Sequence, residues 1–265
     1  MRLEGKTAIV IGAGQSPGEG IGNGRATVLR FAEEGAKVMA VDRDLASAEE
    51  TVSLVKKGGE CVAFEADVTK EATLAAAVAA AHKRWGRIDI LHYNVGVSIA
   101  GGDAPLLDFT EEAFDRISAI NLRGAIMACK HVVPIMRQQR AGAIVMISSL
   151  AAIENYPYVG YKATKAAMIA FTEQVAIQNA EYGIRANVIL PGLIDTPMAV
   201  DTRARVSGKS RATVAAERDA RVPLRRKMGT AWDVANAALF LASDEGNFIT
   251  GVALRVDGGG ALNIG

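Results

Sequence analysis

Short apolar segments alternate with longer segments of helical periodicity along the whole chain, and this alternation restricts the folds it can adopt. The apolar segments cover residues 7–11, 37–41, 61–64, 90–93, 143–147, 186–190 and 253–256. The helical segments cover residues 21–34, 45–57, 71–85, 111–137, 159–181 and 231–242. Because the apolar segments are continuous, they suit strands buried on both faces of a parallel sheet. The repeated alternation predicts a doubly wound α/β fold with about seven parallel strands flanked by helices.

We expect a single domain over residues 1–265, because the chain shows no internal repeat, no low-complexity linker and no shift in composition. Residues that favour helix ends support the predicted helices. Threonines stand at three expected N-caps, which are Thr69, Thr110 and Thr230. Asp233 follows Thr230 by three residues and resembles the acid of a capping box. Gly35 and Gly183 stand where two helices should end.

The composition is that of an ordinary globular protein. Of the residues, 50% are hydrophobic and 22% are charged, and 30 Lys and Arg balance 29 Asp and Glu. The apolar content excludes intrinsic disorder, and the 2 cysteines exclude a disulfide scaffold. The charge balance gives no indication of nucleic-acid binding. Because no apolar run has membrane-spanning length and no signal peptide is recognisable, we expect a cytoplasmic protein without a membrane partner.

A glycine-rich segment follows the first predicted strand and precedes the first predicted helix. It contains Gly12, Gly14, Gly20 and Gly22, with Ile21 between the last two. Such a turn lets the backbone approach a pyrophosphate closely, and the helix N-terminus then offers free N–H groups. A glycine pattern alone is also typical of a flexible connecting loop. Its place between a strand and a helix favours a dinucleotide site.

Asp42 ends the second predicted strand, about twenty residues beyond Gly22. A carboxylate at this position can accept hydrogen bonds from the ribose hydroxyls of NAD and would repel the 2′-phosphate of NADP. Arg43 follows at once and could soften that repulsion or stack on adenine. An Asp at a strand end is also a common helix cap, a role that Asp44 could take instead. The carboxylate of Asp42 therefore favours NAD over NADP.

Tyr161 and Lys165 stand four residues apart on a predicted helix, so both face the same side one turn apart. A nearby ammonium stabilises a phenolate and is expected to lower the tyrosine pKa. The tyrosine could then exchange protons near neutral pH. A Tyr and a Lys at this spacing are more often an ordinary surface pair, so the surroundings must decide.

Polar residues end two neighbouring predicted strands near that helix. Ser148 and Ser149 end the fifth strand, and Asn94 ends the fourth. Ligands bind at the carboxyl edge of parallel sheets, where a serine could bond a substrate carbonyl oxygen. Asn121 lies within a predicted helix, where asparagine is mildly unfavourable, so it calls for a reason.

Together these motifs resemble the short-chain dehydrogenase/reductase family over essentially the whole chain. The matching elements are the glycine loop, Asp67-Val68, Asn94-Val95-Gly96, Asn121, Ser148-Ser149, Tyr161 with Lys165, Pro191-Gly192 with Thr196, and Asp257-Gly258-Gly259. The resemblance implies a single Rossmann-type domain, a nicotinamide cofactor and carbonyl/alcohol redox chemistry without a metal.

The resemblance also implies roles for individual residues. Tyr161 would be the proton donor or acceptor, and Lys165 would lower its pKa and bond the nicotinamide ribose. Asn121 would hold a water in a proton relay, and Ser149 would orient the reacting oxygen. The cofactor would be held by the glycine loop and by Asp42, Arg43, Asp67, Val68, Asn94, Gly96, Pro191, Gly192, Ile194 and Thr196.

The sequence departs from the family pattern in places. Ile11 replaces a usual Thr, and residues 13–19 make the glycine loop longer than usual. The catalytic serine stays open between two candidates. Ser148 lies thirteen residues before Tyr161, which is the commonest spacing, whereas Ser149 better fits the Ser-Ser motif. We favour Ser149.

No strand is expected between residues 196 and 227, and the segment is rich in Lys and Arg. We expect a substrate lid here. Most such basic runs are solvated surfaces, but this one could attract an anionic substrate. An apolar substrate wall could come from Ile153, Tyr156, Tyr158 and Met198, although core packing would explain them nearly as well.

The sequence predicts an NAD-dependent oxidoreductase that interconverts a secondary alcohol and a ketone, with Tyr161 as acid and base. One alternative is an NADPH-dependent reductase of 3-oxoacyl thioesters, and another is a catalytically silent cofactor-binding scaffold. The three histidines share no ligand spacing, so no metal is expected. The resemblance suggests a homotetramer.

Overall fold

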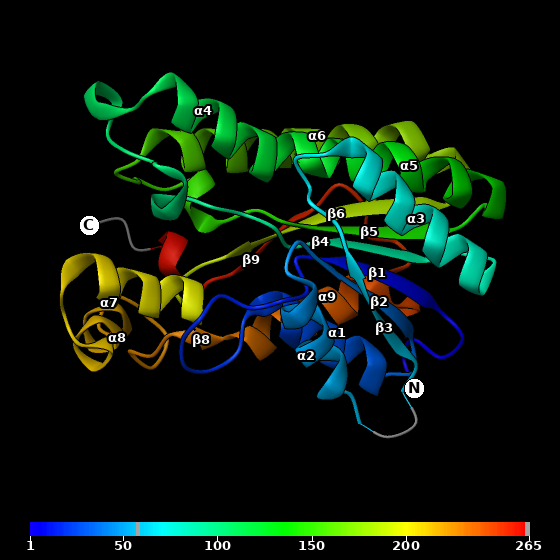
Figure 1. The fold of residues 1–265 in the computed structure, drawn as a ribbon, viewed down its shortest axis with the longest axis horizontal. Helices are drawn as coiled ribbons and strands as arrows, with labels where there is room; N and C mark the ends of the chain where they lie inside the picture. Colours follow the sequence, from blue (N-terminus) through cyan, green and yellow to red (C-terminus); the bar gives the residue numbers. More distant parts are fainter. Residues whose placement is uncertain (57–58, 263–265) are drawn as a thin grey trace.

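Seven parallel strands form one sheet in the computed structural model, which describes residues 1–56 and 59–262 (Figure 1). The strands are β1 (Thr7–Ile11), β2 (Lys37–Asp42), β3 (Cys61–Glu65), β4 (Ile90–Tyr93), β5 (Gly142–Ile147), β6 (Ile184–Pro191) and β9 (Ala253–Val256). They lie in the order β3-β2-β1-β4-β5-β6-β9. Strands β2 and β3 are added on one side of β1, and β4 and the later strands are added on the other side. The strand order therefore reverses between β1 and β4, as in a doubly wound fold. The predicted fold class and all seven predicted strands are confirmed.

Helices cover both faces of the sheet (Figure 1). One face carries α3 (Glu71–Trp85), α4 (Glu111–Ser118), α5 (Gly124–Gln139) and α6 (Val159–Asn179), and the other carries α1 (Asn23–Glu33), α2 (Leu45–Ser53) and α9 (Ala231–Ala242). An apolar core fills each interface, so the strands are buried on both sides. This double burial explains why their sequences are continuously apolar. Helix α2 ends at Ser53, earlier than predicted, and Lys57 lies outside the described residues.

Two of the three predicted threonine caps are confirmed. The Thr110 hydroxyl accepts a hydrogen bond from the Ala113 N–H at 3.2 Å. Thr230 and Asp233 form the expected capping box at the start of α9. The Thr69 prediction is wrong, because Lys70 holds the N-cap position of α3 and no side chain caps this helix. The Thr69 hydroxyl instead donates to the Asp67 carboxylate at 2.8 Å, a local bond that competes with capping.

The predicted helix over residues 111–137 is divided. A π-helical turn at Ala119–Arg123 separates α4 from α5. Such turns insert an extra residue into the helical ladder and are frequent at functional sites. Asn121 lies in this turn, which gives a structural reason for its place among helical residues.

Residues 196–227 leave the sheet at the carboxyl ends of the strands and contain α7 (Thr202–Ser207) and α8 (Arg211–Asp219). Figure 1 shows these helices at the end of the molecule, on the opposite side of the sheet edge from α4. The segment has a small apolar core of its own, formed by Val200, Val214, Val222 and Met228. The only strands next to it are the two-residue β7 (Ile194–Asp195) and β8 (Gly229–Thr230) among the described residues.

Within residues 1–56 and 59–262, no helix is long and apolar enough to cross a membrane.

Candidate active site

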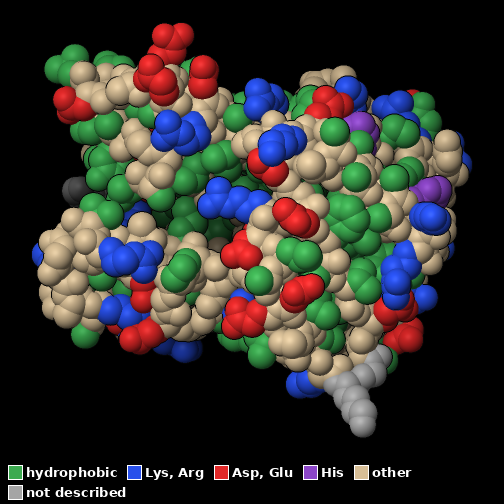
Figure 2. All heavy atoms as spheres, in the orientation of Figure 1, with side chains coloured by type: hydrophobic (Ala, Val, Ile, Leu, Met, Phe, Trp, Pro, Cys, Tyr) green, Lys and Arg blue, Asp and Glu red, His purple; other side chains and the backbone are tan. Residues whose placement is uncertain are grey.

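A cleft of about 540 Å³ runs along the carboxyl edge of the sheet, over the point between β1 and β4 where the strand order reverses. Figure 2 shows the molecule hollowed at this edge, with hydrophobic side chains inside the hollow. Most of the predicted site residues line the cleft, which are Gly12, Gly14, Gly22, Asp42, Arg43, Asp67, Val68, Asn94, Gly96, Ser149, Tyr161, Lys165, Pro191, Gly192, Ile194 and Thr196. Most of the residues predicted from the sequence therefore lie in one cleft, although they come from many separate loops.

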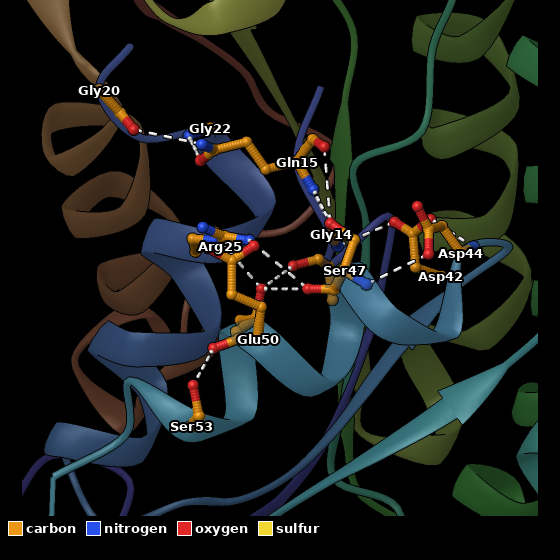
Figure 3. Close-up of polar contacts among 12 residues, drawn as sticks. Gly14, Gln15, Gly20, Gly22, Arg25, Asp42, Asp44, Ser47, Glu50 and Ser53 are labelled. Atoms are coloured by element: carbon orange, nitrogen blue, oxygen red, sulfur yellow. Dashed lines mark hydrogen bonds and ion pairs between the residues drawn. The ribbon is translucent and has the colours of Figure 1, made fainter. Parts of the chain in front are cut away.

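The long glycine loop is held by hydrogen bonds to the second strand and to its own glutamine (Figure 3). The Gly14 N–H donates to the Asp42 carboxylate at 2.8 Å, and the Gln15 N–H donates to the Ser47 hydroxyl at 2.9 Å. The Gln15 side chain closes the loop by accepting a hydrogen bond from the Gly22 N–H at 2.9 Å. The extra residues are thus an ordered part of the cleft wall.

Helix α1 packs unusually close to β1, and glycine permits this. A Cβ at Gly24 would overlap the carbonyl oxygen of Gly12, and Gly12 itself has a φ of +84°. No side chain caps α1, so its first N–H groups remain available where Gly22 and Gly24 line the cleft. An uncapped helix N-terminus beside glycines provides donors and a positive dipole for a phosphate.

Two predicted loop residues do not line the cleft. Gly20 has a φ of +86°, and no atom lies within 4 Å of the position its Cβ would take. Ile21 packs instead against the buried Ala231 and Ala235 of α9, beside Trp232. These residues therefore shape the loop and anchor it to α9, and the cleft surface is formed by their neighbours.

Asp42 presents its carboxylate to the cleft from the end of β2. One oxygen accepts from the Gly14 N–H and the other from the Asp44 N–H at 3.1 Å. Each carboxylate oxygen has a second lone pair, so Asp42 keeps capacity for hydroxyl donors. Asp44 caps α2 by accepting from the Ser47 N–H. The cap role thus belongs to Asp44, and the carboxylate of Asp42 is left to the cleft.

Lys165 lies at the floor of the cleft and is almost fully buried. Its ammonium donates to the carbonyl oxygens of Ile147 at 2.8 Å and Val95 at 3.3 Å. An ammonium has three N–H donors, so one remains. Burial lowers the pKa of Lys165 to about 7. A Cβ at Gly96 would lie 2.9 Å from Nζ, so only glycine leaves room for this lysine.

Tyr161 lies one turn before Lys165 on α6, with its ring centroid 5.7 Å from the lysine Nζ. Burial raises the pKa of Tyr161 to about 12, against the opposing effects of the Ser149 hydroxyl and the charge of Arg203. The Lys165 ammonium donates to backbone carbonyls, and its predicted lowering of the tyrosine pKa stays a prediction. At neutral pH the tyrosine is a phenol, ready to donate a proton.

The two candidate serines have different surroundings. The Ser148 hydroxyl is buried and donates to the backbone carbonyl of Lys165 at 2.6 Å. The Ser149 hydroxyl accepts from the Ala151 N–H at 3.1 Å, which leaves its own proton to donate. Ser149 is also the serine whose hydroxyl acts to lower the pKa of Tyr161. The geometry therefore favours Ser149 for the reacting oxygen, and Ser148 positions the lysine-bearing helix.

Asn121 is fully buried and does not line the cleft. Its side chain accepts from the Val97 N–H at 2.8 Å and donates to the Val97 carbonyl and the Thr164 hydroxyl. Both donors of the amide are thus in use, so the side chain joins the loop after β4 to helix α6. The side chain therefore has a positioning role, and the predicted contact of Asn121 with a water stays a prediction.

Sequence reasoning missed part of the cleft wall. Six missed residues come from the glycine loop, α1 and α2, which are Gln15, Ser16, Pro17, Asn23, Gly24 and Ser47. Two arginines of the 196–227 segment, Arg203 and Arg218, also line it. Their only sequence signal was membership of the basic run. Of the suggested apolar wall, Tyr156 and Met198 line the cleft, and Tyr158 and Ile153 do not.

No group of three or more His, Cys, Asp or Glu residues that could hold a metal ion is present in the described parts of the chain.

The site combines a phosphate-ready helix N-terminus, a carboxylate at the end of β2 and a buried Tyr-Lys pair in one cleft. This combination defines a nicotinamide-dependent oxidoreductase of the Rossmann type. Comparison with known proteins agrees. The family model described as enoyl-(acyl carrier protein) reductase matches residues 17–261. The chain belongs to the short-chain dehydrogenase/reductase family, and it is an NAD(P)-dependent oxidoreductase.

Individual relatives cover the whole chain. The 3-oxoacyl-[acyl-carrier-protein] reductase of Thermotoga maritima is 38% identical, over 98% of this chain and 99% of the relative. The 2-(R)-hydroxypropyl-CoM dehydrogenase of Xanthobacter autotrophicus is 36% identical, over 96% and 97%. A crystal structure described as a short-chain dehydrogenase/reductase from Burkholderia xenovorans superposes with a TM-score of 0.90 at 44% identity, covering 100% of this chain and 99% of that one.

Proposed function

We propose that this enzyme uses NAD to interconvert a secondary alcohol and a ketone. The observation that carries the cofactor choice is the Asp42 carboxylate, which lies at the end of β2 and lines the cleft. Carboxylates in this position accept hydrogen bonds from ribose hydroxyls and repel a 2′-phosphate. We further propose that the enzyme is a cytoplasmic homotetramer and that the 196–227 segment is its substrate lid.

The residues of the cleft fit a dinucleotide. The N-terminus of α1 would hold the pyrophosphate, and Asp42 the adenosine ribose. The remaining N–H of Lys165 would bond the nicotinamide ribose, with Pro191 and Thr196 at the nicotinamide end. The bound cofactor supplies the hydride-transferring ring.

The protein supplies the proton and the orientation of the substrate. In the reductive direction the Tyr161 phenol donates its proton to the carbonyl oxygen, and the Ser149 hydroxyl donates a hydrogen bond to the same oxygen. In the oxidative direction Tyr161 must first lose its proton, which burial opposes. The positive charge of Arg203 favours this phenolate, because it lowers the pKa of Tyr161 against the effect of burial.

Arg43 does not overturn the preference for NAD. Within the described residues it has no carboxylate within ion-pair distance, but its charge acts on Asp67. Burial acts to raise the pKa of Asp67. Hydrogen bonds from Thr69 and the charges of Lys70 and Arg43 outweigh this effect and hold the pKa below its usual value. We propose that Arg43 lies along the adenine side of the cofactor, because it lines the cleft and its charge acts on Asp67.

A fluorescence titration with NADH and then with NADPH tests the cofactor choice. We expect NADH to bind at least about tenfold more tightly, which is about 1.4 kcal/mol. Asp42→Ser should reduce the ratio of NADH affinity to NADPH affinity, because it removes the carboxylate that repels the 2′-phosphate of NADPH. Glu65→Gln is the matched control, since Glu65 is an exposed acid at the end of the neighbouring β3 and does not line the cleft. Tighter binding of NADPH by the unaltered enzyme would contradict the proposal.

The second candidate is reduction of 3-oxoacyl thioesters with NADPH. It is favoured by the 38% identical reductase from Thermotoga maritima, whose name specifies that reaction. Asp42 is the observation against it. The same titration separates the two, because this candidate requires the cofactor preference to be reversed.

A further inference from the structure

Arg218 of α8 is a buried cation that faces the cleft with almost no partner. The residue is 8% exposed and lines the cleft. Its Nε–H donates only to the Met228 sulfur at 3.4 Å, a weak acceptor. No carboxylate lies within 4.0 Å of its guanidinium in the described parts of the chain, and its two terminal nitrogens make no hydrogen bond there. Buried guanidinium groups normally have an anionic partner.

Arg203 of α7 also lines this cleft, and its charge acts on Arg218. One of its terminal nitrogens donates to the Ala199 carbonyl at 2.9 Å, which fixes the side chain. No acidic group of residues 1–56 or 59–262 lies within ion-pair distance of it either. The charge of Arg203 lowers the pKa of both Tyr161 and Arg218, so Arg203 lies near each of them.

The acids of the 196–227 segment and its surroundings are already paired with other cations. Asp195 bonds Arg211 at 2.7 Å, and Asp201 lies 3.4 Å from the same arginine. Glu217 bonds Lys209 and Asp219 bonds Lys227, each at 2.6 Å. These acids pair with Lys209, Arg211 and Lys227, and none of them lies within ion-pair distance of the two arginines that line the cleft.

This arrangement is electrostatically costly without an anion. Burial, together with the charges of Arg203 and Arg221, lowers the pKa of Arg218 to about 10. Two like charges held together in a partly enclosed cleft repel each other, and an oxyanion between them would remove that repulsion. Arginine forks also match the geometry of carboxylates and other oxyanions.

We propose that Arg203 and Arg218 bind an oxyanion carried by the substrate, so the natural substrate is a hydroxy or keto compound that also bears a carboxylate or a similar acidic group. The proposal rests on the proposed alcohol/ketone chemistry and adds the substrate class. The carbonyl group of the substrate would face Tyr161 and Ser149, and the acidic group of the same substrate molecule would face Arg203 and Arg218. The lid segment therefore selects substrates by charge.

Paired probes test the proposal. Levulinate and methyl levulinate differ in the negative charge, as do acetoacetate and methyl acetoacetate. With NADH as cofactor, we expect kcat/KM for each acid to exceed that for its ester by at least about tenfold, the size of one charged hydrogen bond. Equal kcat/KM for acid and ester in the unaltered enzyme would overturn the proposal.

Three variants assign the effect to the two arginines. Arg203→Gln and Arg218→Met should each reduce the acid-to-ester ratio by about tenfold, mainly through KM. The ratio is the readout because Arg203 also influences Tyr161, and that influence acts equally on acid and ester. Arg225→Gln is the control, because Arg225 belongs to the same basic run but is exposed and does not line the cleft. An unchanged ratio in both cleft variants would overturn the assignment.

A binding measurement distinguishes a failure of the oxyanion site from a failure of the proposed redox function. Calorimetry of levulinate with the enzyme–NADH complex should show binding that Arg218→Met weakens and Arg225→Gln preserves. If methyl levulinate is reduced but levulinate neither binds nor reacts better, the oxyanion site is wrong and the redox function stands. If levulinate binds but no ketone is reduced, the redox proposal fails and the oxyanion site stands.

Discussion

Burial moves the pKa values of Tyr161 and Lys165 in opposite directions, and each shift favours the uncharged form. The sequence spacing identified both residues but indicated a charged lysine that lowers the tyrosine pKa. It could not show that the lysine would be enclosed by the ends of β4 and β5, because that depends on residues far away in the chain. The spacing of side chains on a helix is local information, whereas desolvation is a property of the whole fold.

The pKa of Tyr161 leads to a pH prediction. Since burial raises it to about 12, the phenol form dominates at neutral pH. Alcohol oxidation needs the phenolate, so its kcat/KM should rise with pH between about 7 and 10. Ketone reduction uses the phenol and should stay level over the same range. Steady-state rates in both directions check this, and oxidation that is independent of pH would contradict it.

Tyr161→Phe is the matching substitution. It should reduce turnover in both directions by about a hundredfold or more, since a general acid contributes that much. NADH affinity, measured by fluorescence, should stay within about a factor of two to three. Tyr158→Phe is the control, because Tyr158 does not line the cleft. Retained turnover in Tyr161→Phe would remove the tyrosine from its assigned role.

At the scale of elements, the strands and most helices could be predicted because each follows from a local pattern. β1, β4, β9, α3 and α9 have the predicted bounds. The π-helical turn between α4 and α5 could not be predicted, since it forms to satisfy contacts with a loop and a helix elsewhere. The wall residues Arg203 and Arg218 were missed for the same reason. Their direction depends on how α7 and α8 fold over the cleft.

Asn121 provides a test of that turn. Asn121→Ala removes three hydrogen bonds and leaves the part-buried Val97 backbone groups without their side-chain partner. The free energy of unfolding should fall by about 1–3 kcal/mol, since each lost hydrogen bond costs about 0.5–1.5 kcal/mol. Thr164→Val loses only one of the three bonds and should cost less. Urea denaturation measures both, and an equal loss in the two variants would contradict a role for the Val97 bonds.

At the scale of the whole molecule, large hydrophobic side chains are exposed on the outer helices. Phe114 of α4 is 52% exposed and Ile177 of α6 is 72% exposed. Side chains of this size usually contact a partner when several are exposed on one layer. We propose that α4 and α6 contribute to the interface of the proposed homotetramer.

Sedimentation velocity tests the oligomer. The unaltered protein should sediment at about four times the 27.8 kDa mass of one chain. Ile177→Glu should reduce that mass, because it places a charge in the interface. Leu54→Glu is the control, since Leu54 is exposed just after α2 on the opposite layer. A single-chain mass for the unaltered protein at micromolar concentration would contradict the proposal.

The glycine loop and the 196–227 segment hold each other across the mouth of the cleft. The Glu19 N–H donates to Asp201 at 3.1 Å, and Arg205 donates to the Pro17 carbonyl at 3.1 Å. One end of this bridge borders the phosphate site and the other borders the oxyanion site. We therefore expect the two proposed binding equilibria to be linked, because a ligand that orders one side lowers the entropic cost of ordering the other. The long loop would then couple cofactor binding to substrate binding within a single chain.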